Sequence, residues 1–159
     1  MQKKTDQPLT YHSALLKAEA YCAYQERSQY EVRGKLIALG LRGLDVENII
    51  TSLIENNFLS EERFAIAYAN GKLRIKSWGR RKIAEGLKFK QVSAPLIKKA
   101  LKSLDEDEYL EKLKDLLEKK RPTIKEKKEY QQNYKLSQYA ISKGFEPDLV
   151  FYILKANEL

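Results

Sequence analysis

Amphipathic helical spacing runs through nearly the whole chain, and it limits the possible folds more than any other feature. Apolar residues recur every three or four positions, the spacing that places them on one side of an α-helix. The clearest stretches are Val46, Ile49, Ile50, Leu53 and Ile54; Leu96, Ile97, Ala100, Leu101 and Leu104; and Leu149, Val150, Ile153 and Leu154. The commonest residues, among them Leu, Lys, Glu, Ala and Ile, favour helices over strands. The sequence therefore predicts an all-α fold.

The helical pattern occurs in three successive rounds of three helices. The predicted units are 11–57, 58–104 and 105–159, and they follow a tail at 1–10 that we predict to be disordered. Apolar pairs spaced 47 and 53 residues apart are predicted to be equivalent in the third helices: Ile49–Ile50, Leu96–Ile97 and Leu149–Val150. Because such small units bury little core alone, neighbours must pack together. We expect three tandem three-helix repeats that form an elongated, curved array.

Polar residues and glycines predict where several of these helices begin and end. Ser28 and Glu31 match a capping box, and Gly40 and Gly144 are natural helix C-termini. Further predicted N-caps are Asp45, Ser60, Ser77 and Ser93. Further predicted ends are Asn56–Asn57 and Pro122. The helix after Ser60 is predicted to turn one face inward, formed by Phe64, Ala67, Tyr68 and Gly71.

Residue types that carry catalysis or bind metals are scarce. The chain has one histidine, His12, beside the predicted tail, and one cysteine, Cys22, which is most simply a small core residue. One His and one Cys form no zinc site, and a lone Cys suits a reducing, cytosolic setting. No Gly-rich phosphate loop and no apolar run long enough to span a membrane is present. These features predict a non-enzymatic, cytoplasmic protein with no cofactor and no metal.

The acidic run Asp105 to Glu108 has two interpretations. Carboxylates can bind a cation, but consecutive acids on a helix point in different directions. Acidic residues also favour the positive end of the helix dipole. We therefore predict that this run begins a helix.

The positive charge is concentrated in one segment. Residues 72–102 hold eleven Lys and Arg against one acid, Glu85, whereas the whole chain has a net charge of +8. A solvated helix face is the simpler interpretation, but surfaces kept for solubility usually mix both signs. A local basic field attracts polyanions such as nucleic acid. The candidate binding residues are Arg74, Lys76, Arg80, Arg81, Lys82, Lys88 and Lys90. Trp78 lies within the segment, and we favour a role as a core anchor over stacking on a base.

The centre of the chain carries a distinctive run of residues. It is Phe58-Leu59-Ser60-Glu61-Glu62-Arg63-Phe64-Ala65-Ile66-Ala67-Tyr68, followed by Arg74 and by Trp78-Gly79-Arg80-Arg81-Lys82-Ile83. This run resembles the central signature of the RecX family of bacterial regulators of the RecA recombinase. The first repeat is similar to the family in Arg27-Ser28, Glu31, Lys35-Leu36 and Gly40, and the C-terminal end in Lys143-Gly144-Phe145. One departure is Phe89-Lys90-Gln91, where the family usually ends the middle helix with a glycine.

The resemblance implies a function. Family members are all-α proteins that bind the RecA–DNA filament along its groove and restrain recombination, ATP hydrolysis and co-protease activity, which connects them to DNA repair and the SOS response. It also implies that Phe64, Tyr68 and Gly79 are packing residues that aim the basic surface. We expect a monomer with a weak, salt-sensitive contact to DNA and no membrane partner. The alternatives are an autonomous DNA-binding module that acts without RecA, and a helical scaffold for another acidic protein.

Overall fold

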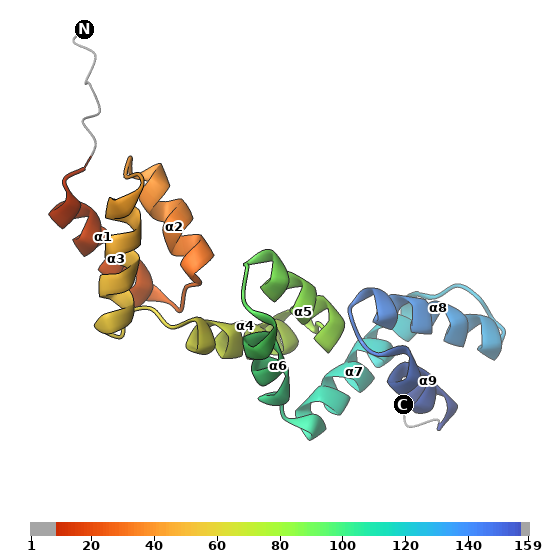
Figure 1. Cartoon of the computed structure of the whole chain (residues 1–159). Coiled ribbons are helices and arrows are strands. Elements are labelled where there is room, and N and C mark those ends of the chain that lie inside the picture. Colours follow the sequence, from red (N-terminus) through yellow and green to blue (C-terminus); the bar gives the residue numbers. More distant parts are fainter. Residues whose placement is uncertain (1–8, 157–159) are drawn as a thin grey trace, which may run out of the picture. The chain divides into compact units, whose positions relative to one another are not determined.

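The computed structural model describes residues 9–156, which form nine α-helices and one short 3-10 helix with no strand among them (Figure 1). The predicted all-α fold is therefore confirmed. The helices are α1 (Tyr11–Tyr24), α2 (Gln29–Ala38), α3 (Leu44–Glu55), α4 (Glu61–Lys76), α5 (Arg80–Phe89), α6 (Ala94–Lys102), α7 (Glu106–Lys120), η1 (Arg121–Thr123), α8 (Glu129–Ser142) and α9 (Pro147–Lys155). Within this described part, no helix has the length and hydropathy that a membrane span requires.

The chain divides into two compact units, Met1–Phe64 and Ala65–Leu159, and the boundary falls inside α4. The predicted division into three repeats stays a prediction. Most of the predicted tail, residues 1–8, lies outside the described residues, and Thr10 at its end is the N-cap of α1.

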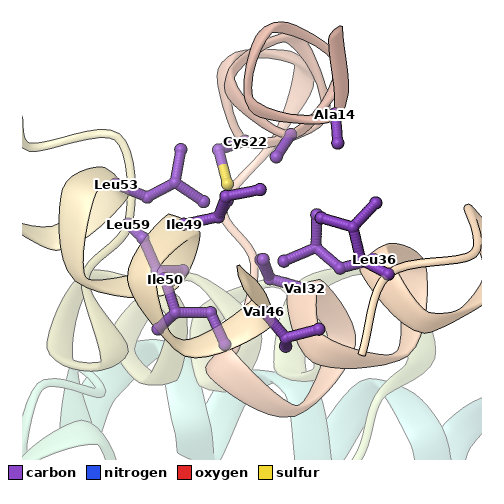
Figure 2. Close-up of a cluster of buried hydrophobic side chains, with 11 residues drawn as sticks. Ala14, Cys22, Val32, Leu36, Val46, Ile49, Ile50, Leu53 and Leu59 are labelled. Atoms are coloured by element: carbon purple, nitrogen blue, oxygen red, sulfur yellow. The ribbon is translucent and has the colours of Figure 1, made fainter. Parts of the chain in front are cut away.

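The first unit is built around helices α1, α2 and α3, which pack on one another. Their buried side chains meet in one cluster, which includes Ala14, Leu36, Ile49 and Leu53, all fully buried (Figure 2). Cys22 points into the same cluster, and its burial raises the pKa of its thiol to about 11. The prediction that this cysteine is a core residue is therefore confirmed.

Local capping signals place most helix ends in the first unit. Ser28 and Glu31 form both hydrogen bonds of the capping box, and Gly40 ends α2 in the left-handed region with φ of 97°. Asn57, with φ of 61°, ends α3 as predicted. The prediction for Asp45 is wrong, because the N-cap of α3 lies two residues earlier, at Gly43 with φ of 60°.

In the second unit, the buried face of α4 differs from the predicted one. Ala65, Ala69 and Leu73 are fully or almost fully buried, at intervals of four, and they form the buried face of this part of α4. Ala67 is exposed, and Tyr68 and Gly71 are only half-buried. The prediction was right for Phe64 and wrong for the other three residues. Both sides of this helix carry small or apolar residues, so periodicity alone did not distinguish the two sides.

The second unit also corrects the predicted start of α5. Ser77 does not cap that helix; it ends α4 in the left-handed region, with φ of 53°. The Trp78 N–H donates to the Lys72 carbonyl at 3.1 Å, which closes the C-terminus of α4. Helix α5 begins at Arg80, and Gly79 is its N-cap.

The ends of the middle helices show how the repeats correspond. Gly40, Gln91 and Gly144 all have positive φ, at 97°, 59° and 97°, and each ends the second helix of its round. Measured from these residues, Leu96–Ile97 corresponds to Leu149–Val150 as predicted. Ile49 corresponds instead to Ala100 and Ile153, so the prediction is wrong for the pair Ile49–Ile50. At Phe89-Lys90-Gln91, where the sequence departs from the RecX pattern, Gln91 adopts the positive φ that a glycine usually adopts at a helix end.

Candidate functional site

The candidate binding residues lie on α4, on α5 and at the turn after α5, all in the second unit. The structure separates them into two groups. Arg74 and Arg80 form ion pairs with acids of the third round of helices. The others lie at the surface, and we call Lys76, Arg81, Lys82, Lys88 and Lys90 the basic face.

The charge of Arg80 is used for contacts within the protein and is not available to an external partner. One guanidinium nitrogen contacts Glu106 at 2.6 Å, and another contacts Glu146 at 3.4 Å. The guanidinium also lies over the ring of Tyr109, 3.9 Å from its centroid. Three groups from α7 and the α8–α9 turn therefore hold the Arg80 side chain, which is 24% exposed.

Tyr109 completes this network and was not singled out from the sequence. Its ring is fully buried and packs against Phe145, with the ring centroids 5.1 Å apart. Its hydroxyl donates to Glu146 at 2.9 Å and accepts from the Arg80 N–H at 3.0 Å. Burial is the main cause that raises the pKa of Tyr109, so the hydroxyl keeps its proton. The tyrosine thus joins the start of α5 to the start of α9.

The start of α5 docks backbone to backbone against the turn between α8 and α9. The Gly79 N–H donates to the Lys143 carbonyl at 2.8 Å, and the Arg81 N–H donates to the Gly144 carbonyl at 3.0 Å. A Cβ on Gly79 would lie 2.4 Å from backbone atoms of Gly144 and Phe145. Only glycine permits this approach, which gives a physical reason for the glycine of the Trp-Gly-Arg-Arg motif.

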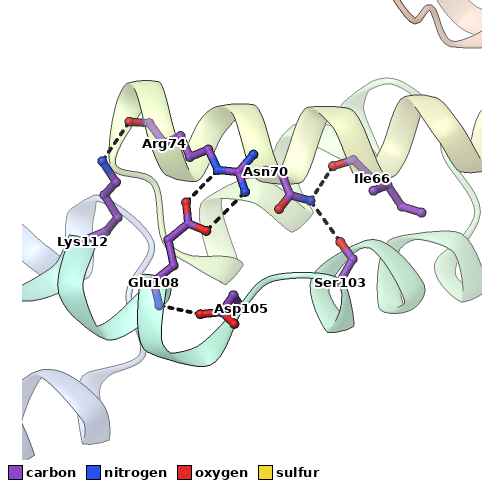
Figure 3. Close-up of polar contacts among 7 residues, drawn as sticks. All are labelled: Ile66, Asn70, Arg74, Ser103, Asp105, Glu108 and Lys112. Atoms are coloured by element: carbon purple, nitrogen blue, oxygen red, sulfur yellow. Dashed lines mark hydrogen bonds and ion pairs between the residues drawn. The ribbon is translucent and has the colours of Figure 1, made fainter.

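Arg74 pairs with Glu108 of α7 through two hydrogen bonds, at 2.7 and 3.3 Å (Figure 3). The guanidinium of Arg74 lowers the pKa of Glu108. Asp105 accepts from the Glu108 N–H at 2.8 Å and so caps α7, which begins within the acidic run as predicted. The acidic run therefore begins a helix and pairs with two arginines of the basic segment, and no cluster of three metal-binding side chains occurs among the described residues.

The basic face contains cations that the internal ion pairs of Arg74 and Arg80 do not involve. Lys76, Arg81 and Lys88 are exposed, and within residues 9–156 none of the three forms an ion pair with an acid. Arg81 and Lys88 lie seven positions apart on α5 and therefore share one side of the helix. Their charges are available to an external partner.

Trp78 supports the basic face. The Lys72 and Lys82 ammonium groups each lie 4.8 Å from the centroid of its ring. The ring is half-buried, and its contact with these lysines restricts where their charges lie. Phe64 and Tyr68 were also predicted to pack and so to aim the basic surface. Phe64 is buried. The Tyr68 hydroxyl fills the space where a side chain on Gly86 would lie.

Comparison with known sequences identifies the chain. The pattern described as the RecX second three-helix domain matches residues 60–101, and that of the third three-helix domain matches residues 106–154. The regulatory protein RecX of Thermotoga petrophila is 30% identical over 152 residues, which cover 95% of this chain and 84% of that protein. The chain belongs to the RecX family. It is thus a member of a family of regulatory proteins, and not of a family of enzymes, as predicted.

Other RecX relatives match over less of their length. The regulatory protein RecX of Lactobacillus johnsonii is 36% identical over 98 residues, which cover 62% of this chain and 36% of that protein. The chain therefore spans about a third of that relative. Among solved structures, RecX from Lactobacillus salivarius superposes with a TM-score of 0.82 at 23% identity, over 92% of this chain and 95% of that one. This similarity confirms the RecX fold.

Proposed function

We propose that the chain is a modulator of the RecA recombinase that binds the RecA–DNA filament and restrains strand exchange, ATP hydrolysis and co-protease activity. Membership of the RecX family supports regulation as the general role. The observation that carries the proposal further is that Lys76, Arg81 and Lys88 of the basic face are exposed and form no ion pair with an acid in the described part of the chain. In this account the chain works as a cytoplasmic monomer.

The proposal assigns different roles to the seven candidate residues. Arg74 and Arg80 hold α4 and α5 against the third round of helices through their acidic partners. Lys76, Arg81, Lys82, Lys88 and Lys90 provide the electrostatic contact with the filament. The network around Arg80 fixes the start of α5, so the direction of Arg81 and Lys88 is set before the filament is met.

A charge-reversal variant tests this assignment. Arg81→Glu combined with Lys88→Glu inverts two exposed charges that no internal ion pair uses. We expect this variant to bind preformed RecA–DNA filaments at least tenfold more weakly, because reversing two charges replaces attraction with repulsion. The matched control is Lys17→Glu with Lys119→Glu, which makes the same change in net charge at exposed positions outside the basic segment. The measurement is co-sedimentation with filaments, with bare DNA in parallel.

Three results would contradict the proposal. Equal loss of binding in both double variants would mean that only net charge matters. Normal binding by the Arg81 and Lys88 variant would exclude the basic face as the contact. Binding to bare DNA at physiological salt that is as tight as binding to the filament would favour the autonomous DNA-binding module.

A further inference from the structure

Three hollows on the surface of the second unit lie next to one another around α8. The first, of about 480 Å³, shares Glu126 and Lys135 with the second, of about 530 Å³. The second shares Tyr130 and Tyr134 with the third, of about 400 Å³, which continues to α9. Because neighbouring hollows share lining residues, they adjoin one another, and we refer to the three together as the depression. We call its aromatic and basic lining the aromatic track: Tyr130, Tyr134, Phe151, Lys125, Lys135 and Lys155.

The rings of this track lie on the surface instead of in the core. Tyr130, Tyr134 and Phe151 are 67%, 63% and 53% exposed, while the buried face of α8 is formed by Leu136 and Ala140. The two tyrosines lie four positions apart and are neighbours along the helix. Both tyrosines line the second hollow and the third hollow. Exposed rings can stack against planar groups of a ligand, and the Lys128 ammonium, 5.9 Å from the centroid of the Tyr130 ring, adds a cation beside one of them.

The charge of the depression favours an anionic ligand. Four lysines line the three hollows, at positions 120, 125, 135 and 155, against one acid, Glu126. Glu126 is paired with Lys135 at 2.5 Å, and this contact lowers the pKa of the glutamate. The lone carboxylate is therefore already neutralised by a lysine within the lining. The other lysines leave the depression with an excess of positive charge.

We propose that the aromatic track binds single-stranded nucleic acid, with bases stacked on Tyr130 and Tyr134 and phosphates beside the lysines. Stacking on aromatic rings within a basic groove is how proteins bind single strands without sequence preference. A duplex does not satisfy this site, because its base faces are covered by their neighbours. The site lies on α8 and α9, separate from the basic face on α4 and α5, and it requires no recombinase.

A binding assay tests the proposal with the full chain carrying Arg81→Glu and Lys88→Glu, which reverses two of the five charges of the basic face and so weakens its contribution. The probes are fluorescein-labelled oligo(dT) of about 15 nucleotides, within the site sizes of single-strand-binding modules, and an abasic oligomer of equal length. The test variant adds Tyr130→Ala and Tyr134→Ala. One control adds Tyr130→Phe and Tyr134→Phe, which keep the rings. A second adds Tyr152→Ala, which removes a 61% exposed tyrosine on α9 that lines none of the hollows.

The alanine variant is expected to bind oligo(dT) about tenfold more weakly in fluorescence anisotropy, with the abasic oligomer little affected, because only bases stack. The phenylalanine and Tyr152 controls are expected to bind as the parent does. Unchanged oligo(dT) binding by the alanine variant would overturn the proposal. An equal loss of affinity for the abasic oligomer would also overturn the proposal, because the track would then act through charge alone. If poly-glutamate competed with oligo(dT) as well as unlabelled oligo(dT) does, the track would be a site for an acidic protein instead. Circular dichroism establishes that each variant is folded.

Discussion

Replacing Gly79 with alanine is expected to break the contact that fixes the basic face. Gly79 has φ of −83°, which any residue adopts, so the added methyl group acts only through its contacts. That methyl would lie 2.4 Å from backbone atoms of the α8–α9 turn, which cannot move aside as a flexible side chain can. The start of α5 must therefore separate from the turn.

The cost follows from what that separation disrupts. The two backbone hydrogen bonds at 2.8 and 3.0 Å contribute about 0.5–1.5 kcal/mol each. Residual overpacking adds about 1–3 kcal/mol. The expected loss in the free energy of unfolding of the second unit is therefore about 2–6 kcal/mol, a large share of the about 5–15 kcal/mol typical of a domain.

Urea denaturation followed by the fluorescence of Trp78, the single tryptophan, reports on this unit. With a slope of about 2 kcal/mol per molar urea, the Gly79→Ala midpoint is expected to fall by about 1 M or more. The matched control is Gly71→Ala in α4, where a Cβ meets nothing within 4 Å. That control is expected to raise stability by about 0.5–1 kcal/mol. If Gly79→Ala unfolds at the wild-type midpoint, the backbone docking is not what holds α5 in place.

Three further predictions concern single residues of the second unit. Gln91→Gly is expected to stabilise it by about 1 kcal/mol in urea, because glycine adopts the φ of 59° without strain; a lower midpoint would contradict this. Tyr109→Phe is expected to cost about 1–3 kcal/mol, since Glu146 and the backbone N–H at the start of α5 lose their partner; an unchanged midpoint would show that water replaces the hydroxyl. The Arg74 contact lowers the pKa of Glu108, so its small stabilisation is present above the ordinary glutamate pKa and lost as the pH falls through the lowered value. Glu108→Gln is expected to reduce the acid sensitivity of the midpoint, and an identical pH profile would refute that.

Local features of the helix ends could be predicted from the sequence. The capping box at Ser28, the left-handed Gly40 and Gly144, and the acidic start of α7 depend on residues only a few positions apart. Such interactions act within one turn of helix, so the chemistry of neighbouring residues determines them. Gln91 shows that the turn geometry is kept even where glycine is absent.

The start of α5 could not be predicted from its own sequence. Ser77 is a favoured N-cap residue, but the first N–H groups of α5 are satisfied by partners far along the chain. The Gly79 and Arg81 N–H groups bond to the α8–α9 turn, and the Arg80 N–H bonds to Tyr109. These long-range partners replace a local side-chain cap, and the helix begins where they are available.

Long-range ion pairs also limited how well the candidate site could be predicted from the sequence. The basic segment could be located in the sequence, but the sequence does not show that Arg80 and Arg81 differ in exposure and in ion pairing. The structure distinguishes them because Glu106 and Glu146 approach one arginine and leave the other exposed. A signal was present in the acidic run, whose members are the partners of Arg74 and Arg80.

The most direct test of the central claim is the rate of single-strand-DNA-dependent ATP hydrolysis by the cognate RecA while this protein is titrated in at fixed salt. The account predicts that hydrolysis falls at protein concentrations too low to coat the DNA, and that the Arg81→Glu and Lys88→Glu variant inhibits far less than the Lys17→Glu and Lys119→Glu control. Hydrolysis that is unaffected, or that falls only once the protein has saturated the DNA, would contradict action on the filament.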